Sequence, residues 1–79
     1  MALDITVTHE VDECIVCVNG EVDVSNAAEL RSALEAALIG GTSKITADFS
    51  DVSYIDSTGI GVLVGIAHRA QEIQVVFVV

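Results

Sequence analysis

A short polar segment that carries two hydroxyl groups beside an acid interrupts an apolar part of the chain. The run before it, Lys44–Phe49, alternates apolar and polar residues like a half-buried strand, and the run after it, Ile60–Ala70, is suited to about three turns of helix. The segment between them carries one acid, two hydroxyl groups and two glycines: Asp56, Ser57, Thr58, Gly59 and Gly61. Ser57 is therefore expected at a helix N-terminus, where unpaired backbone N–H groups favour an anion.

Two interpretations of Ser57 are open at this point. In the first, its hydroxyl is only the N-cap of the second helix, and Asp56 only satisfies backbone donors. In the second, Ser57 is phosphorylated, and the added charge of about −1.5 to −2 leaves the fold intact because a helix N-terminus accepts anions. The phosphate would then disrupt a partner that fits the neutral hydroxyl, and a penalty of ~3 kcal/mol would weaken binding about a hundredfold.

Three glycines in the second helix are spaced almost as in a dinucleotide-binding loop. The pattern Gly59-x-Gly61-x-x-x-Gly65 differs by one residue from G-x-G-x-x-G, and no acid follows a next strand to bind a ribose. Glycine inside a helix costs about 1 kcal/mol relative to alanine, so three of them indicate a close backbone approach. The approaching group is either the sheet beneath the helix or a partner above it.

The cysteines and histidines do not form a recognisable catalytic or metal-binding pattern. Cys14 and Cys17 lie three residues apart in a predicted strand, so their side chains point to opposite faces and cannot share a metal or a disulfide. His9 is predicted in a loop and His68 late in a helix, and neither has a serine or cysteine partner implied by the sequence. We therefore expect two free, buried or half-buried thiols, no metal site and no enzymatic activity.

Length, composition and charge limit the class of protein. A chain of 79 residues with 52% apolar residues suits one small domain. The formal charge is −9, and the basic residues are only Arg31, Lys44 and Arg69, which cannot form the basic face of a nucleic-acid or anionic-membrane binder. No signal peptide is visible, and the longest run of apolar residues and glycine, Gly59–Ala67, is too short to span a bilayer. A cytoplasmic location is expected.

The periodicity predicts an α/β domain. Predicted strands cover Leu3–Thr8, Cys14–Val18, Lys44–Phe49 and Ile73–Val79, with a loop at His9–Glu13. The first helix runs from Asn26 to Leu38, is capped by Ser25 or Asn26 with a capping box to Glu29, and ends at Gly40–Gly41. The strand, helix and strand between Cys14 and Phe49 predict a parallel crossover, and Ser57 opens the second helix.

The C-terminal part of the sequence lacks two features that such a domain needs. Gln74–Val79 is apolar on both faces, so it needs cover on both sides. The link Arg69–Glu72 into the last strand contains no glycine or asparagine to end the helix. These features predict a domain truncated at its C-terminus, and homodimerisation, strand exchange and aggregation are the alternatives that could replace the missing cover.

Taken together, these segments resemble the STAS domain, and more narrowly the stand-alone bacterial anti-anti-sigma factors, also called anti-sigma factor antagonists. The likeness runs from about Leu3 to Ala70 and depends on Gly20–Asp23, the helix from Asn26, and above all the block Asp56–Leu63. It implies a single STAS domain over residues 1–79, with a mixed sheet and helices packed on one face. The family usually has a glycine-containing turn after the second helix and further elements beyond the next strand, which this sequence lacks.

The resemblance also implies a mechanism of partner switching. The unphosphorylated family member binds an anti-sigma factor that is also a serine kinase and so releases a sigma factor, and a phosphatase resets the phosphorylated form. The phospho-acceptor corresponds to Ser57, and the partner surface to Asp23, Asp56, Thr58, Gly59 and Gly61. ATP belongs to the kinase, so no cofactor is expected on this chain. The alternative is a constitutive STAS scaffold or transporter-associated module without a phospho-switch, and a small nucleotide-binding domain is a distant third.

Overall fold

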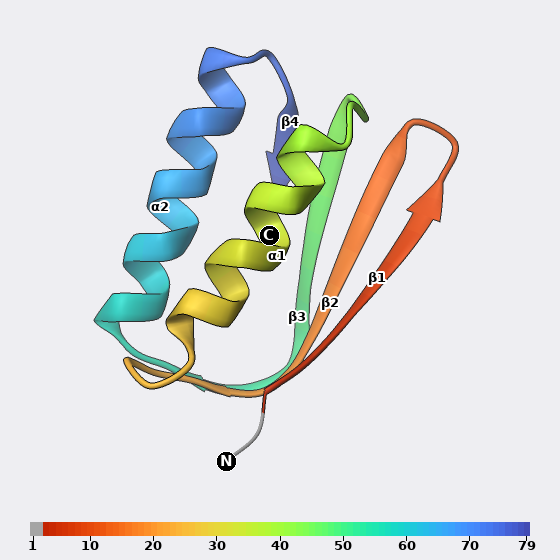
Figure 1. The fold of residues 1–79 in the computed structure, drawn as a ribbon. Helices are drawn as coiled ribbons and strands as arrows, with labels where there is room; N and C mark the ends of the chain where they lie inside the picture. The colour runs from red at the N-terminus through yellow and green to blue at the C-terminus, as the bar shows by residue number, and fades with distance from the viewer. Residues whose placement is uncertain (1–2) are drawn as a thin grey trace.

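The computed structural model describes residues 3–79, which form one mixed sheet with two helices on the same face (Figure 1). The sheet order is β1-β2-β3-β4, with β1 antiparallel to β2 and the other neighbours parallel. The elements are β1 (Asp4–Glu10), β2 (Glu13–Val22), α1 (Ala27–Ile39), β3 (Lys44–Ile55), α2 (Ser57–Glu72) and β4 (Val76–Val78). The predicted fold class and the parallel crossover are confirmed.

The core lies between the sheet and the helices, and β2 contributes its centre. Alternate β2 side chains point to the helices and are buried, whereas Ile15 and Cys17 on the other face are half-buried. Both cysteines are free, as predicted, and burial raises the pKa of the Cys14 thiol. The buried apolar side chains are Cys14, Val16, Val18, Val22, Ala27, Leu30, Leu34, Ala37, Leu38, Ile45, Ala47, Val62, Ile66 and Ala70. Within residues 3–79, no helix is long and apolar enough to cross a bilayer.

Three strands are longer than their apolar alternation predicted. The first connection is only a two-residue turn at Val11 and Asp12 rather than a loop over His9–Glu13. β2 and β3 remain paired as far as Val22 and Ile55, beyond the predicted ends of both strands. The reason is that polar side chains can point to the open face of the sheet while their backbone groups stay in the ladder. Strand pairing therefore extends beyond the alternating apolar segments.

The first helix ends at the predicted pair Gly40–Gly41, whereas the second helix ends without a glycine or asparagine. Gly40 is right-handed, with φ −65°, and Gly41, with φ 85°, is the left-handed residue that turns the chain toward β3. After α2 the left-handed position is taken by Gln74, with φ 60°, so the link needs no glycine. The last strand is shorter than the predicted Ile73–Val79. The first residues of that range form the turn, and only β4 pairs with β3.

Replacing Thr42 by valine is expected to raise the free energy of unfolding by up to about 1 kcal/mol, because burying an unpaired hydroxyl is unfavourable. The Thr42 hydroxyl oxygen is buried without a hydrogen-bond partner among residues 3–79. Thr46→Val is the control: the Thr46 hydroxyl donates to Glu13 at 2.7 Å, so its loss should lower stability. Urea unfolding measures both, and a larger loss in Thr42→Val than in Thr46→Val would contradict this assignment.

Candidate functional site

Two loops that are far apart in the sequence meet at one end of the sheet. β2 and β3 are parallel, and their last residues, Val22 and Ile55, lie opposite each other in the ladder. The backbone N–H of Asp56 then donates to the carbonyl of Val22 at 3.1 Å. The turn after β2, which begins at Asp23, is therefore beside the N-terminus of α2 (Figure 1). The structure thus brings together the two segments that the sequence singled out.

Asp56, and not Ser57, is the N-cap of α2. Its backbone is extended, and its carboxylate accepts hydrogen bonds from the backbone N–H groups of Thr58 at 2.9 Å and Gly59 at 3.1 Å. The N-cap interpretation of Ser57 is therefore wrong, since the residue that precedes it already fills this role. Ser57 is the first helical residue and is exposed. Its hydroxyl makes no hydrogen bond within the described part of the chain and lies at the surface.

The glycines of α2 have two different environments. Gly59 is buried, and an added Cβ would lie 2.7 Å from Ile55 Cγ1 and 2.8 Å from Val22 Cγ1. The predicted close approach to the sheet is confirmed there, and Gly59 lets the first turn of α2 rest on the ends of β2 and β3. Gly61 and Gly65 are exposed, and nothing in the described chain lies within 4 Å of an added Cβ. A partner above these two glycines stays a prediction.

The turn after β2 is organised by two side chains. The Asp23 carboxylate accepts from the Ser25 hydroxyl and, at 2.9 Å, from the Ser25 backbone N–H, and these bonds lower the pKa of Asp23. Asn26 lies at the N-cap position of α1 but makes no side-chain cap, so the predicted capping box with Glu29 is wrong. The reason is that the Asn26 amide points back to β2 and bonds to the backbone of Glu21 and Asp23.

Nothing in the residue pattern indicated this role of Asn26. An asparagine before a helix normally signals a cap, and only the fold shows that its amide faces the end of β2 instead. The remaining predicted residue, Thr58, is exposed in the first turn of α2. The assembled site is therefore an exposed surface of two loops that share a backbone hydrogen bond.

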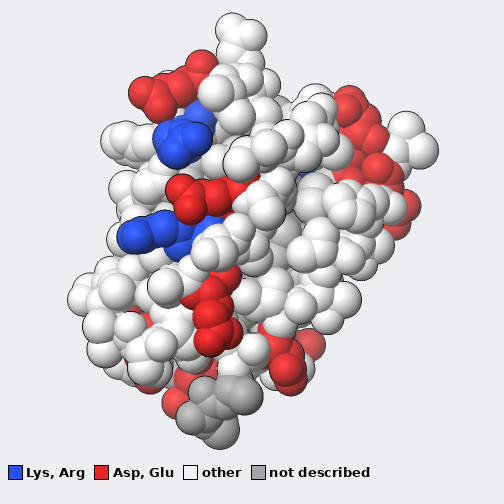
Figure 2. Space-filling view, in the orientation of Figure 1, with Lys and Arg blue, Asp and Glu red and all other residues white. Residues whose placement is uncertain are grey.

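Neither histidine lies beside Asp56 and Ser57. His9 lies in β1 and His68 in the second half of α2. Arg31 and Arg69 line a groove between the helices, where Arg69 is 3.9 Å from Glu35. Figure 2 shows the basic side chains of this face interspersed with acidic ones over the helices, without a continuous basic area.

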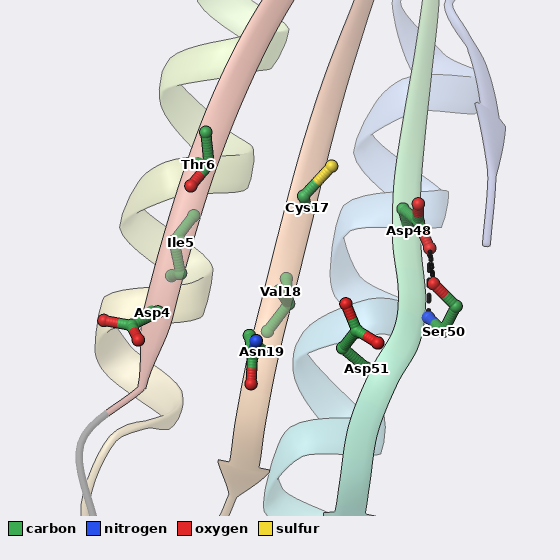
Figure 3. Close-up of a pocket in the computed structure, with 9 residues that line it drawn as sticks. All are labelled: Asp4, Ile5, Thr6, Cys17, Val18, Asn19, Asp48, Ser50 and Asp51. Carbon is green, nitrogen blue, oxygen red and sulfur yellow. Dashed lines mark hydrogen bonds between the residues drawn. The ribbon is translucent and has the colours of Figure 1, made fainter.

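A second concave region lies on the open face of the sheet, away from the helices (Figure 3). Its cavity of about 400 Å³ is lined by Asp4, Ile5, Thr6, Cys17, Val18, Asn19, Asp48, Ser50 and Asp51. The hydroxyl and the backbone N–H of Ser50 donate hydrogen bonds to the Asp48 carboxylate, and these bonds lower the pKa of Asp48. No group of three or more histidine, cysteine or acidic side chains in residues 3–79 is placed to hold a metal ion. The region contains none of the predicted site residues.

A sequence model of the STAS domain matches residues 2–79 of the chain. The chain belongs to the STAS family. It is similar to the anti-sigma-B factor antagonist of Staphylococcus epidermidis, with 42% identity over 60 residues, which are 76% of this chain and 55% of that relative. The chain thus spans about half the length of the relative it matches.

Solved structures support the same fold. An anti-sigma factor antagonist from Mycobacterium paratuberculosis superposes with a TM-score of 0.88 over 96% of this chain and 64% of that one, at 22% identity. The Bacillus cell fate determinant SpoIIAA in its phosphorylated form superposes with a TM-score of 0.78 over 96% of this chain and 70% of that one, at 18% identity. At these identities the likeness establishes the STAS fold alone.

Alanine substitutions at the glycines of α2 should change stability in opposite directions. Gly59→Ala is expected to lower the free energy of unfolding by about 1–3 kcal/mol, because the new methyl group overlaps Val22 and Ile55. Gly61→Ala and Gly65→Ala have open space and should each raise it by up to about 1 kcal/mol through helix propensity. Thermal and urea unfolding of the three variants measure this, and a stabilised Gly59→Ala variant would contradict the packing described here.

Proposed function

We propose that this STAS domain acts as an anti-sigma factor antagonist, a non-enzymatic cytoplasmic regulator that switches partners on phosphorylation of Ser57. The observation that carries the proposal is the free, exposed hydroxyl of Ser57 at the start of α2, beside the turn that holds Asp23. A relative with 42% identity, named an anti-sigma-B factor antagonist, supports the choice of partner class.

In the unphosphorylated state, the surface around Ser57 binds an anti-sigma factor that is also a serine kinase, and the sigma factor is released. Asp23, Asp56, Thr58 and Gly61 contribute to this surface, and Gly59 supports it from below. The kinase uses its own ATP to phosphorylate Ser57, which ends the interaction, and a phosphatase restores the hydroxyl. No cofactor on this chain is needed for these steps.

The physical basis of the switch is a change of surface charge without a change of fold. Ser57 caps nothing and is exposed, so a phosphate there breaks no hydrogen bond that holds α2 in place. It adds about −1.5 to −2 charges next to the Asp56 carboxylate. A partner that buries the neutral hydroxyl would have to desolvate this charge or meet it with a cation.

Ser57→Asp is expected to weaken binding to the anti-sigma factor about a hundredfold or more, whereas Ser57→Ala should bind like the wild type but accept no phosphate. Paired capture from the native host with these two baits, followed by calorimetry on the captured kinase, measures the effect. Ser32→Asp, on an exposed position of α1, controls for the added charge alone. Equal capture by both Ser57 baits would reject the switch and favour a constitutive STAS scaffold.

A further inference from the structure

We propose that Asn26 is a positioning residue, which fixes the Asp23 turn against the N-terminus of α2 and so presents both loops to the partner as one rigid surface. The inference rests on the proposed function, because it names a residue that prepares the same surface without contacting the partner. The Asn26 side chain is not part of that exposed surface, since the residue is only 6% exposed.

Among residues 3–79, Asn26 is the buried polar residue. Both the oxygen and the NH₂ group of its side-chain amide form hydrogen bonds. Its oxygen accepts from the backbone N–H of Asp23 at 2.9 Å, and its NH₂ group donates to the carbonyl of Glu21 at 2.8 Å. These partners flank Val22. A buried amide must keep both bonds to avoid unpaired polar groups, so it fixes the backbone on each side of Val22.

Val22 in turn connects this turn to α2. Its carbonyl accepts the Asp56 N–H at 3.1 Å, and its side chain packs where a Cβ on Gly59 would otherwise lie. The segment Glu21–Asp23 is therefore held by Asn26 on one side and by the start of α2 on the other. Displacement of Asn26 would loosen the Asp23 turn first and, through Val22, the Asp56 N–H.

The consequence for binding is preorganisation. A partner that contacts Asp23 and Ser57 together binds more tightly when the two loops are already fixed, because less conformational entropy is lost on binding. Asn26 acts through Asp23 in this account. Removal of Asn26 should therefore weaken binding most while the Asp23 side chain is present to make its contact, and less once that side chain is removed.

The first test is a double-mutant cycle with the captured anti-sigma factor. Asn26→Ala should weaken binding about tenfold, and should add little to the loss already caused by Asp23→Ala, since contacts in one network are not additive. Ile45→Val, a core change at the other end of β3, is the stability control and should leave affinity unchanged. Full additivity of Asn26→Ala and Asp23→Ala would overturn the proposal.

The second test uses this protein alone, so it stands if the proposed function fails. Hydrogen exchange followed by NMR should show at least about tenfold faster exchange of the Asp23 and Asp56 N–H groups in Asn26→Ala, with β1 amides unchanged. If the alanine variant does not fold, Asn26→Ser replaces it, because the shorter serine side chain cannot make both bonds. It should likewise show faster exchange of the Asp23 and Asp56 N–H groups than of the β1 amides. Faster exchange at Asp23 with no change at Asp56 would overturn the coupling between the loops.

Discussion

The hydrogen bond from the Asp56 N–H to the Val22 carbonyl is the interaction on which the candidate site depends. It exists because β2 and β3 are parallel, so that the carboxyl ends of both strands reach the same edge of the sheet. α1 connects the two strands, and its buried leucines pack against the side chains of both strands in the core. Residues that are more than thirty positions apart thereby form one surface. A different strand order would separate Asp23 from Ser57 even with the same local structure.

The packing beneath this surface explains why α2 starts where it does. Gly59 allows the first helical turn to contact Val22 and Ile55, and Asp56 satisfies the N–H groups that this turn leaves free. The two residues have complementary roles, one steric and one polar. Ser57 lies between the cap and the packed glycine, yet the structure requires nothing of its side chain.

The sequence was sufficient for those features that depend on periodicity and not for those that depend on side-chain direction. Apolar alternation in β2 and the leucine stripe of α1 predicted the layers and the parallel crossover, because burial on one face leaves a repeat in the sequence. Asp56 satisfies backbone donors as expected, but the N-cap was assigned to Ser57 instead of Asp56, and the role of Asn26 was missed. Aspartate and serine are both common N-cap residues, so residue type alone does not choose between Asp56 and Ser57. The choice depends on where the helical backbone begins: Asp56 is extended and Ser57 is the first helical residue. The turn at Gln74 was missed because glutamine does not favour the left-handed conformation that it adopts there.

The capping arrangement also determines how a phosphate on Ser57 would act. The N–H groups of Thr58 and Gly59 are already bonded to the Asp56 carboxylate, so the N-terminus of α2 has an anion in place. Two of the cations are paired elsewhere, Lys44 with Glu13 and Arg69 with Glu35. The phosphate would therefore add to a negative charge instead of replacing one, with less gain from the helix dipole than an uncapped helix offers. The added charge would then act mainly on the affinity for a partner that binds this surface and little on the stability of the fold. A partner switch requires this property.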